Sequence, residues 1–400
     1  MALLPVNEAQ VRLLALAKPL PIERVPVAEA LGRFLAEPLV AARTQPPADL
    51  SAMDGYALRQ TDMPGPWRVI GESSCGHPFT GTCGAGEAVR IATGALMPDG
   101  ADMVLMQEDA ARDGDDLALT GTPPGPLGKH IRRKGNDFAK GAQLLPAGSR
   151  LGPGQLALVL SAGHNFAAVR RPPRIAIIDS GDELSEDAGN CADHQIPASN
   201  GVMLEALVRQ AVPCEVERIG PVIDRMDALA AALQQAEGAD VIVTSGGASV
   251  GEHDLIRPAL AEWGATLDFW KVAIKPGKPI MVATRGHQVV VGLPGNPVSS
   301  HVTAYLFLLP LLRALLGAVQ PLPQPIAARA AEALPAGGPR QEFQRAHFDG
   351  IQATSRLNQD SGALGALARA NALIDRPIDA PAVEAGGVIS LYLLENGGIA

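Results

Sequence analysis

The middle of the chain alternates short apolar runs with amphipathic segments. Apolar runs without polar alternation are typical of strands buried on both faces of a sheet, and apolar residues at helical spacing are typical of the helices that cover it. Such alternation predicts a parallel, doubly wound α/β domain. The expected strands are 175–178, 215–219, 241–244 and 289–291, and the expected helices are 201–211, 225–236, 255–263 and 298–316.

The pattern differs on both sides of this region. Residues 7–18 and 27–35 have helical spacing, and a helical run at 154–162 is expected to pack with them. Between them, short β-like pieces alternate with glycine- and proline-rich turns, and β-like segments return near the end of the chain. We therefore expect a discontinuous N-terminal domain (1–43 plus 140–171), a β-rich insertion domain (44–139), an α/β domain (172–320) and a C-terminal β domain (326–400).

Composition supports several domains and limits the partners. A length of 400 residues exceeds what one core usually supports. The formal net charge is −9 and the chain has no basic tract, so we expect no nucleic-acid binding. Because the protein is acidic overall, binding an anion requires a local concentration of cations, which makes clusters of lysine informative.

Cysteines and apolar segments indicate the compartment. The four cysteines form no C-x-x-C pair, which favours free thiols in a reducing compartment. The first residues lack the pattern of a secretory signal, and the most apolar stretch, 302–316, is interrupted by Pro310 and Arg313 and is too short to span a bilayer. We therefore expect a cytoplasmic protein that does not enter the membrane.

The strand expected at 241–244 runs into a glycine-rich loop. Glycines allow backbone conformations and close approaches that a Cβ forbids, so several N–H groups of such a loop can face an anion. The two acids at its end offer hard oxygen ligands for a divalent cation, although a plain tight turn has the same composition. The groups concerned are Ser245, Gly246, Gly247, Ser249 and Gly251 for the anion, and Glu252 and Asp254 for the cation.

Two further strands are expected to end in loops that could bind a cation or an anion. Glu183, with Asp182 beside it, follows the strand at 175–178 and could hold Mg²⁺, or could be a solvated acid of a capped turn. Pro294 and Pro297 stiffen the loop after 289–291, and the helix that follows would present its positive dipole end to an anion. Ligands of doubly wound sheets bind at the carboxyl ends of the strands, so these loops are expected to meet.

A lysine cluster and two acids complete the candidates. Lys271 and Lys275 would share one face of a strand, with Lys278 after a Pro-Gly turn, and could bind an oxyanion unless all three are solvated. Asp54 and Asp137 stand in turns of the insertion domain, where a plain turn or a solvated loop is the alternative. The segment that begins at Thr93 also resembles a polar loop after a strand.

Together these segments resemble the molybdopterin molybdenumtransferase family, which includes bacterial MoeA and the gephyrin E domain. The resemblance extends over nearly the whole chain and rests on many blocks in one order. At three positions the chain differs from the usual pattern, which has an acid at Ala198, Glu at Asn136 and Thr at Ser180. The blocks are Ala30 to Arg33, Ser51 to Ala57, Ile91 to Ala95, Arg133 to Asp137, Ser180 to Leu184, Ser245 to Asp254, Lys271 to Pro279, Gly292 to Pro297, Gln359 to Gly362 and Ala370 to Ile374.

The resemblance implies an enzyme that uses molybdate to insert molybdenum into adenylylated molybdopterin, with Mg²⁺ and release of AMP. It implies an elongated homodimer, in which each chain has a molybdopterin-binding doubly wound α/β domain, a β-rich insertion, an elongated mixed N-terminal domain and a β-barrel-like C-terminal domain. Transient contact with other proteins of molybdenum-cofactor biosynthesis is also implied.

The roles that the resemblance implies are assigned by position. A non-catalytic molybdopterin-binding scaffold remains the alternative function, and an adenylyltransferase that activates molybdopterin is a third possibility. The implied catalytic residues are Asp54, Asp137, Glu183, Asp254, Lys271 and Lys275; the implied cofactor-binding residues are Thr93, Ser245, Gly246, Gly247, Ser249, Gly251, Lys278, Pro294 and Pro297; and the implied metal ligands are Asp54, Glu183 and Asp254.

Overall fold

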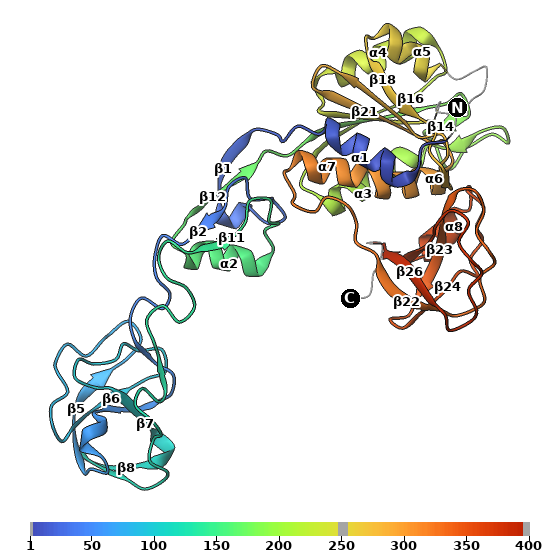
Figure 1. Cartoon of the computed structure of the whole chain (residues 1–400). Coiled ribbons are helices and arrows are strands. Elements are labelled where there is room, and N and C mark those ends of the chain that lie inside the picture. The colour runs from blue at the N-terminus through green and yellow to red at the C-terminus, as the bar shows by residue number, and fades with distance from the viewer. Residues whose placement is uncertain (1–2, 247–254, 395–400) are drawn as a thin grey trace.

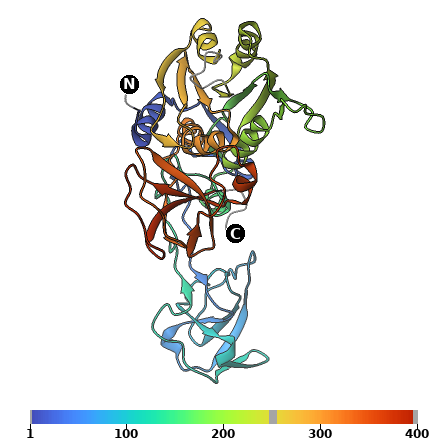
Figure 2. The same cartoon turned by 90° about the vertical axis from the view of Figure 1, so that its right-hand side faces the viewer.

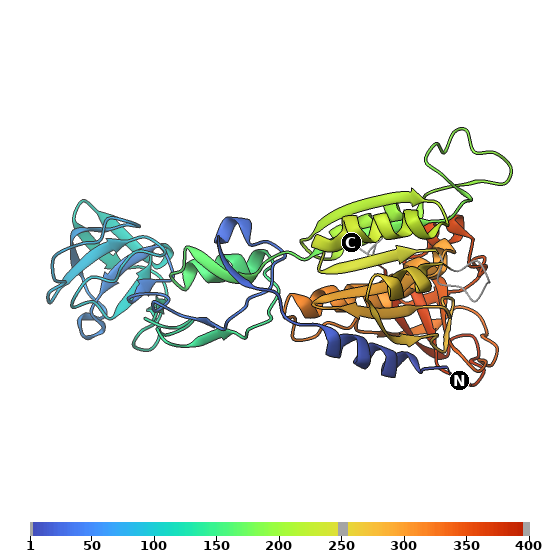
Figure 3. The same cartoon turned by 90° about the horizontal axis from the view of Figure 1, so that it is seen from above.

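A computed structural model describes residues 3–246 and 255–394 of the chain. The molecule is elongated (Figure 1), with the insertion domain at one end and a narrow N-terminal domain in the middle. The α/β domain and the C-terminal domain lie together at the other end, and the view from above shows the first three of these domains in a row (Figure 3). The candidate residues of the insertion domain are therefore far along the molecule from those of the α/β domain.

A six-stranded sheet forms the centre of the α/β domain, in the order β16-β13-β17-β21-β20-β18. The first four strands are parallel, but β20 runs antiparallel to β21 and β18 antiparallel to β20. The expectation of a purely parallel sheet was therefore wrong at one edge, because the two-residue connection Gly286-His287 leaves no room for a crossover helix. The strands are β13 (Arg174–Ser180), β16 (Glu215–Val222), β17 (Val241–Ser245), β18 (Thr266–Trp270), β20 (Met281–Arg285) and β21 (Gln288–Leu293).

Helices cover both faces of this sheet (Figure 1). On one face Ile175 and Ile177 pack into a core shared with α1, α3 and the long helix of α6, η5 and α7. On the other face the alternate residues Ala176 and Ile178 pack against α4 and α5. The helices are α1 (Val6–Leu16), α3 (Asn200–Ala211), α4 (Met226–Gln235), α5 (Ile256–Glu262), α6 (Pro297–Thr303), the π-helical η5 (Ala304–Leu308) and α7 (Leu309–Leu315).

The long helix Pro297–Leu315 is a core element. It is long and apolar enough, by length and composition, to cross a membrane, but 89% of its apolar window is buried inside the protein. A helix that is apolar on every side and packed between a sheet and other helices has the composition expected of a buried core helix. It lies where the pattern predicted a helix, at 298–316.

The N-terminal domain is a narrow connector made from two separate parts of the chain. It contains β1 (Ile22–Pro26) paired with β12 (Phe166–Arg170), β2 (Leu39–Val40) paired with β11 (Gln143–Leu145), and α2 (Pro153–Ser161). The helix expected at 27–35 is reduced to a single 3₁₀ turn, η1 (Val27–Glu29). The reason is Gly32, whose φ of 75° lies in the left-handed region and ends helical continuation.

The insertion and C-terminal domains are built from sheets. The insertion domain has a curled sheet in the order β7-β4-β6-β5-β9-β8, and the C-terminal domain closes into a five-stranded barrel because β23 pairs with both β24 and β25 (Figure 2). A short strand pair, β3 (Leu50–Ser51) with β10 (Ile131–Arg132), joins the ends of the insertion. The sheet strands are β4 (Gly55–Leu58), β5 (Trp67–Ser73), β6 (Glu87–Ile91), β7 (Met103–Met106), β8 (Ala110–Asp113), β9 (Asp116–Leu119), β22 (Ile326–Ala330), β23 (Gln341–Phe348), β24 (Gln352–Thr354), β25 (Ala372–Arg376) and β26 (Val388–Leu393).

Candidate functional site

A cavity of about 430 Å³ lies at the carboxyl edge of the central sheet. The strands β13, β17 and β21 end side by side there, because Asp179 pairs with Ser245 and Ser245 pairs with Leu293. The sequence-predicted meeting of the three loops is therefore observed, as doubly wound sheets require. The lining residues are Asp179, Ser180, Glu183, Leu184, Ile196, Pro197, Ala198, Ser199, Asn200, Ser245, Gly246, Gly295, Asn296, Pro297, Gly362 and Leu364.

Asn200 joins these strand ends to one another. Its side-chain amide donates to the Ser245 hydroxyl over 2.9 Å and to the Gly295 carbonyl over 2.7 Å. The first residue of α3 is thus fixed to the ends of β17 and β21. Asn200 orients the Ser245 hydroxyl, one of the predicted anion donors, at the wall of the cavity.

Asp179 is a buried carboxylate in the same wall. One of its oxygens accepts a hydrogen bond from the Gly201 N–H over 2.8 Å, while the other has no partner among the described residues. Burial raises the pKa of Asp179 to about 6, against the opposing effects of Gly201, Ser245 and Arg218. The first turn of α3 therefore already holds a carboxyl group.

Gly246 begins the glycine-rich loop in a conformation that requires glycine. Its φ is 101°, and a Cβ at this position would lie 2.3 Å from the Ser180 carbonyl oxygen. The backbone of the loop can therefore approach β13 closely only without a side chain. The remaining predicted residues of this loop, Gly247, Ser249, Gly251, Glu252 and Asp254, lie outside the described residues.

Acids gather beside the cavity at the exit of β13. Glu183 lines the cavity, and Asp182 accepts a hydrogen bond from the backbone N–H of Asp224 over 2.9 Å. Burial raises the pKa of Asp224, and the charges of Asp182 and Glu183 raise it further. Residues 3–246 and 255–394 contain no group of three side chains that could hold a metal ion. Glu183 and the buried Asp179 are the two carboxyl groups that the described cavity wall offers a cation.

The lysine cluster follows β18, whose carboxyl end lies at the same edge of the sheet because it runs in the direction of β21. The predicted single strand face for Lys271 and Lys275 is wrong. Lys271 has a φ of 69°, which ends β18, and its ammonium lies 3.9 Å from the centre of the Trp270 ring. Lys275 stands in a separate strand, β19 (Ile274–Lys275), and pairs with Glu342 of the barrel over 2.9 Å.

These lysines do not line the cavity. Lys278 is exposed in the loop that follows β19, and the described residues of the cavity wall include no lysine or arginine. An anion placed against Ser245 would therefore need positive charge from neighbouring loops or from outside this chain. The neighbouring loop with Lys271, Lys275 and Lys278 is one such source.

The loop after β21 connects the cavity to the C-terminal domain. Pro294 is buried behind the wall, while Pro297 lines the cavity and begins α6. The Asn296 side chain donates to the Ser361 hydroxyl over 2.9 Å, and the Val298 N–H donates to the Ser361 carbonyl over 3.1 Å. One side of the cavity is thus formed by the segment before α8 (Leu364–Arg369) of the C-terminal domain.

The candidates of the insertion domain form a second group. Asp54 accepts a hydrogen bond from the Thr93 N–H over 2.7 Å, and this bond, with the charge of Arg90, lowers the pKa of Asp54. Both residues are exposed, as is Asp137 in the segment after β10. The insertion domain, which contains this group, and the α/β domain, which contains the strand-end cavity, lie at opposite ends of the molecule (Figure 1).

Several residues of the cavity were not predicted. Asp179 and Asn200 are not among the predicted site residues, because their roles depend on neighbours that are distant in sequence. Gly362 and Leu364 come from the C-terminal domain. The only signal for them was the Gln359–Gly362 block, which the family resemblance includes.

Comparisons with known proteins agree with this architecture. Residues 4–163 match the MoeA N-terminal region (domain I and II), residues 176–314 match a probable molybdopterin binding domain, and residues 327–394 match the MoeA C-terminal region (domain IV). The chain is 34% identical to the molybdopterin molybdenumtransferase of Haemophilus influenzae, over 97% of this chain and 98% of that protein. It is also 34% identical to the enzyme of that name from a Nostoc species, over 89% and 85%. The crystal structure of the molybdopterin biosynthesis moeA protein from Pyrococcus horikoshii superposes with a TM-score of 0.85, at 28% identity, over 98% of this chain and 100% of that one.

Proposed function

The chain belongs to the molybdopterin molybdenumtransferase family, and we propose that it inserts molybdenum into molybdopterin. The observation that supports this most directly is the strand-end cavity, which combines the Ser245 hydroxyl, the Gly246 backbone and the start of α6 at one wall. A pterin substrate with phosphate groups needs such a surface, because backbone N–H groups and hydroxyls bind phosphate oxygens.

The substrate that fits best is adenylylated molybdopterin, with release of AMP. Its phosphates would lie against Ser245 and Gly246, and Pro297 would hold the helix start rigidly beside them. The flat apolar side of the pterin would face Leu184, Ile196 and Pro197. Asn200 has no direct part in the chemistry in this arrangement, since both of its hydrogen bonds hold the wall in place.

Molybdate needs positive charge, and the lysines after β18 are placed to supply it. Lys271 and Lys275 follow β18, which ends at the same edge of the sheet as the strands that form the cavity. Lys275 is bound to Glu342 in the free protein, so binding of molybdate would compete with an exposed ion pair that contributes little. Charge-assisted contacts of about 1.5–3 kcal/mol each would then hold the dianion.

Mg²⁺ fits this site only in part. Glu183 is a hard oxygen donor in the cavity wall, and Asp54 is kept ionised by Thr93 in the insertion domain. When bound, Mg²⁺ would neutralise phosphate oxygens and make AMP a better leaving group. Glu183 and Asp54 would hold it, together with the phosphates and with Asp254.

A homodimer would bring the two groups of residues together. Within one chain the insertion domain lies at the opposite end from the cavity (Figure 1), so Asp54, Thr93 and Asp137 cannot reach it without a second copy. The proposed site is therefore formed by the α/β domain of one copy and the insertion domain of the other. Dimers with twofold symmetry contain two such sites.

The function is tested by measuring AMP release from adenylylated molybdopterin with the purified full-length protein, Mg²⁺ and molybdate. We expect release that depends on molybdate and stops when Mg²⁺ is chelated. Binding of the pterin without AMP release, at any molybdate concentration, would instead support the non-catalytic scaffold. Incubation of molybdopterin with ATP is the control for adenylylation, which we expect to be absent.

The cellular setting follows from the same proposal. The substrates are small, reactive molecules of molybdenum-cofactor biosynthesis, and the four free cysteines suit a reducing compartment. We propose a cytoplasmic location, with transient contact to the proteins that supply the pterin and receive its product. Fractionation of cells that express the tagged full-length chain tests the location.

A further inference from the structure

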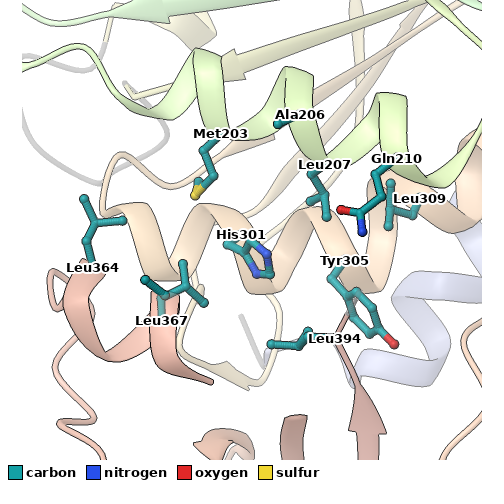
Figure 4. Close-up of a pocket in the computed structure, with 11 residues that line it drawn as sticks. Met203, Ala206, Leu207, Gln210, His301, Tyr305, Leu309, Leu364, Leu367 and Leu394 are labelled. Carbon is teal, nitrogen blue, oxygen red and sulfur yellow. The ribbon is translucent and has the colours of Figure 1, made fainter. Parts of the chain in front are cut away.

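A second cavity, of about 320 Å³, lies between the α/β domain and the C-terminal barrel (Figure 4). Its walls come from α3, from the long helix of α6, η5 and α7, from α8 and from the end of β26. Its lining includes Gln210 and His301 and is otherwise mainly apolar, with Met203, Leu207, Leu309 and Leu367 among its residues. The volume falls within the range of small-molecule sites, and the lining has their mainly apolar character.

His301 places a polar group in this apolar wall. Its side chain points from α6 into the cavity (Figure 4), and only 6% of the residue is exposed. Its Nδ1 atom has no hydrogen-bond partner among the described residues. Burial lowers the pKa of His301 to about 4, so the ring is neutral at physiological pH and offers a hydrogen bond without a charge. A buried ring nitrogen without a partner is costly unless something binds to it.

We propose that this cavity binds a small, uncharged, mainly apolar molecule whose one hydrogen-bonding group meets the His301 ring. The apolar walls contribute affinity by removing the ligand from water. They also exclude charged molecules, because a charge in this cavity would lose its hydration and find no opposite charge. The lining therefore favours uncharged ligands over charged ones.

The cavity is separate from the proposed substrate site. Leu364 lines both cavities, so they lie on two sides of the same short segment before and within α8. Their chemistry differs, since the substrate cavity contains Asp179, Glu183 and Ser245, whereas the second cavity contains no carboxylate among its lining residues. A ligand with phosphate groups belongs in the first and an uncharged ring in the second.

The proposal is tested by titrating the full-length protein with indole, which is uncharged and has one N–H donor. We expect one molecule per chain and a Kd of about 0.1–1 mM, as for a ligand of this size. Indole-3-carboxylate has the same ring with a negative charge, and we expect it to bind at least about tenfold more weakly. Isothermal titration calorimetry without any pterin or molybdate measures both, so the result does not depend on the proposed function.

A matched pair of variants on α3 locates the binding site. Ala206 lines the cavity from an exposed position on α3, so the larger side chain of Ala206→Phe would occupy the cavity and weaken indole binding at least about tenfold. Val202 lies one turn earlier on the same helix, outside the lining, and is 54% exposed, so Val202→Phe adds similar bulk and should leave binding unchanged. Thermal melting confirms that both variants fold.

Three results would overturn the proposal. Indole could fail to bind the unmodified protein, it could bind both variants equally, or the carboxylate could bind as tightly as indole. If indole fails to bind and Ala206→Phe also weakens the dimer in sedimentation experiments, the cavity belongs to the contact between two copies of the chain.

Discussion

The side-chain amide of Asn200 donates a hydrogen bond to the hydroxyl of Ser245 over 2.9 Å, across the carboxyl edge of the central sheet. This bond fixes the start of α3 to the end of β17, and a second bond from the same amide, to the Gly295 carbonyl, fixes it to the loop after β21. One side chain thus sets the relative position of three loops that form the proposed substrate cavity. Its effect is on the shape of the site.

Replacement of Asn200 by Ala should therefore weaken substrate binding while the protein remains folded. Two hydrogen bonds are lost, each worth about 0.5–1.5 kcal/mol, so the KM for the pterin should rise by a factor between about 5 and about 150. Initial rates of AMP release at varied pterin concentration measure the change. Asn190→Ala is the control, because Asn190 bonds to Asp187 in an exposed loop outside the cavity. Equal KM values for the two variants would remove Asn200 from this role.

Gly246 is expected to tolerate no side chain. In Gly246→Ala the new methyl group would meet the Ser180 carbonyl at 2.3 Å, so β13 and the loop would have to separate. Gly264→Ala is a close control, since Gly264 also has a positive φ, of 87°, but has nothing within 4 Å of an added Cβ. The backbone strain of about 1–3 kcal/mol is common to both.

The two glycine variants should therefore differ in more than stability. Denaturant unfolding should show a larger loss for Gly246→Ala than for Gly264→Ala, and AMP release should fall only in Gly246→Ala. If the two variants lose the same stability and keep the same activity, the close contact with Ser180 has no functional importance.

A heterodimer tests whether the active site is shared between copies. We expect Asp54→Ala and Glu183→Ala to be inactive as homodimers. A heterodimer of the two, purified with a different tag on each copy, has one site in which both residues are intact and should recover about half of the normal activity. AMP release measures it. If each site lies within a single chain, the heterodimer should remain as inactive as its parents.

The sequence predicted most elements of the α/β domain, because buried strands and amphipathic helices leave a local pattern. The strand at 241–244 and the helix at 298–316 are both observed near their expected bounds. The antiparallel edge was missed, since Thr266–Trp270 has a mixed pattern that depends on its partner β20. Strand direction is decided by pairing and by the length of the connection, and no single segment encodes it.

The candidate site was predictable where it follows strand ends and was missed where it depends on tertiary contacts. Ser245, Gly246 and Glu183 were identified from their positions after buried strands, and all three line the cavity. Lys275 was expected beside Lys271 on one strand face, but the positive φ of Lys271 turns the chain toward Glu342 of the barrel. A sequence pattern contains no information on that partner.

Lys275→Ala tests whether Lys275 binds molybdate or serves only in the ion pair with Glu342 of the barrel. The ion pair with Glu342 has its lysine 55% exposed, so its loss should cost less than about 1 kcal/mol of stability. Although burial alone would raise the pKa of Glu342, Lys275 is the main group that lowers it, so this pKa should rise in the variant. If Lys275 binds molybdate, the KM for molybdate should rise at least about tenfold while the KM for the pterin changes little.

Initial rates at varied molybdate concentration test this, with Lys140→Ala as the control. Lys140 is an exposed lysine outside the α/β domain, so its loss changes the net charge equally without affecting the site. An unchanged KM for molybdate in Lys275→Ala would leave Lys275 with only its contact to the barrel.

Asp179 should make stability depend on pH in a defined window. Its pKa is raised by burial from 3.8 to about 6, so the folded protein binds more protons than the unfolded chain between about pH 4 and pH 6. Stability from this residue is therefore full below pH 4 and is lost as the pH rises to 6. Asp179→Asn does not titrate and keeps an oxygen that can accept the Gly201 N–H. The stability of the variant relative to the unmodified protein should thus increase by about 1.5–3 kcal/mol from pH 4 to pH 7 and then stay constant.

Urea unfolding of both proteins across this pH range measures the difference in their free energies of unfolding, in which the contributions of the other titrating groups cancel. A difference that does not change with pH would show that Asp179 is ionised as easily in the folded protein as in the unfolded chain.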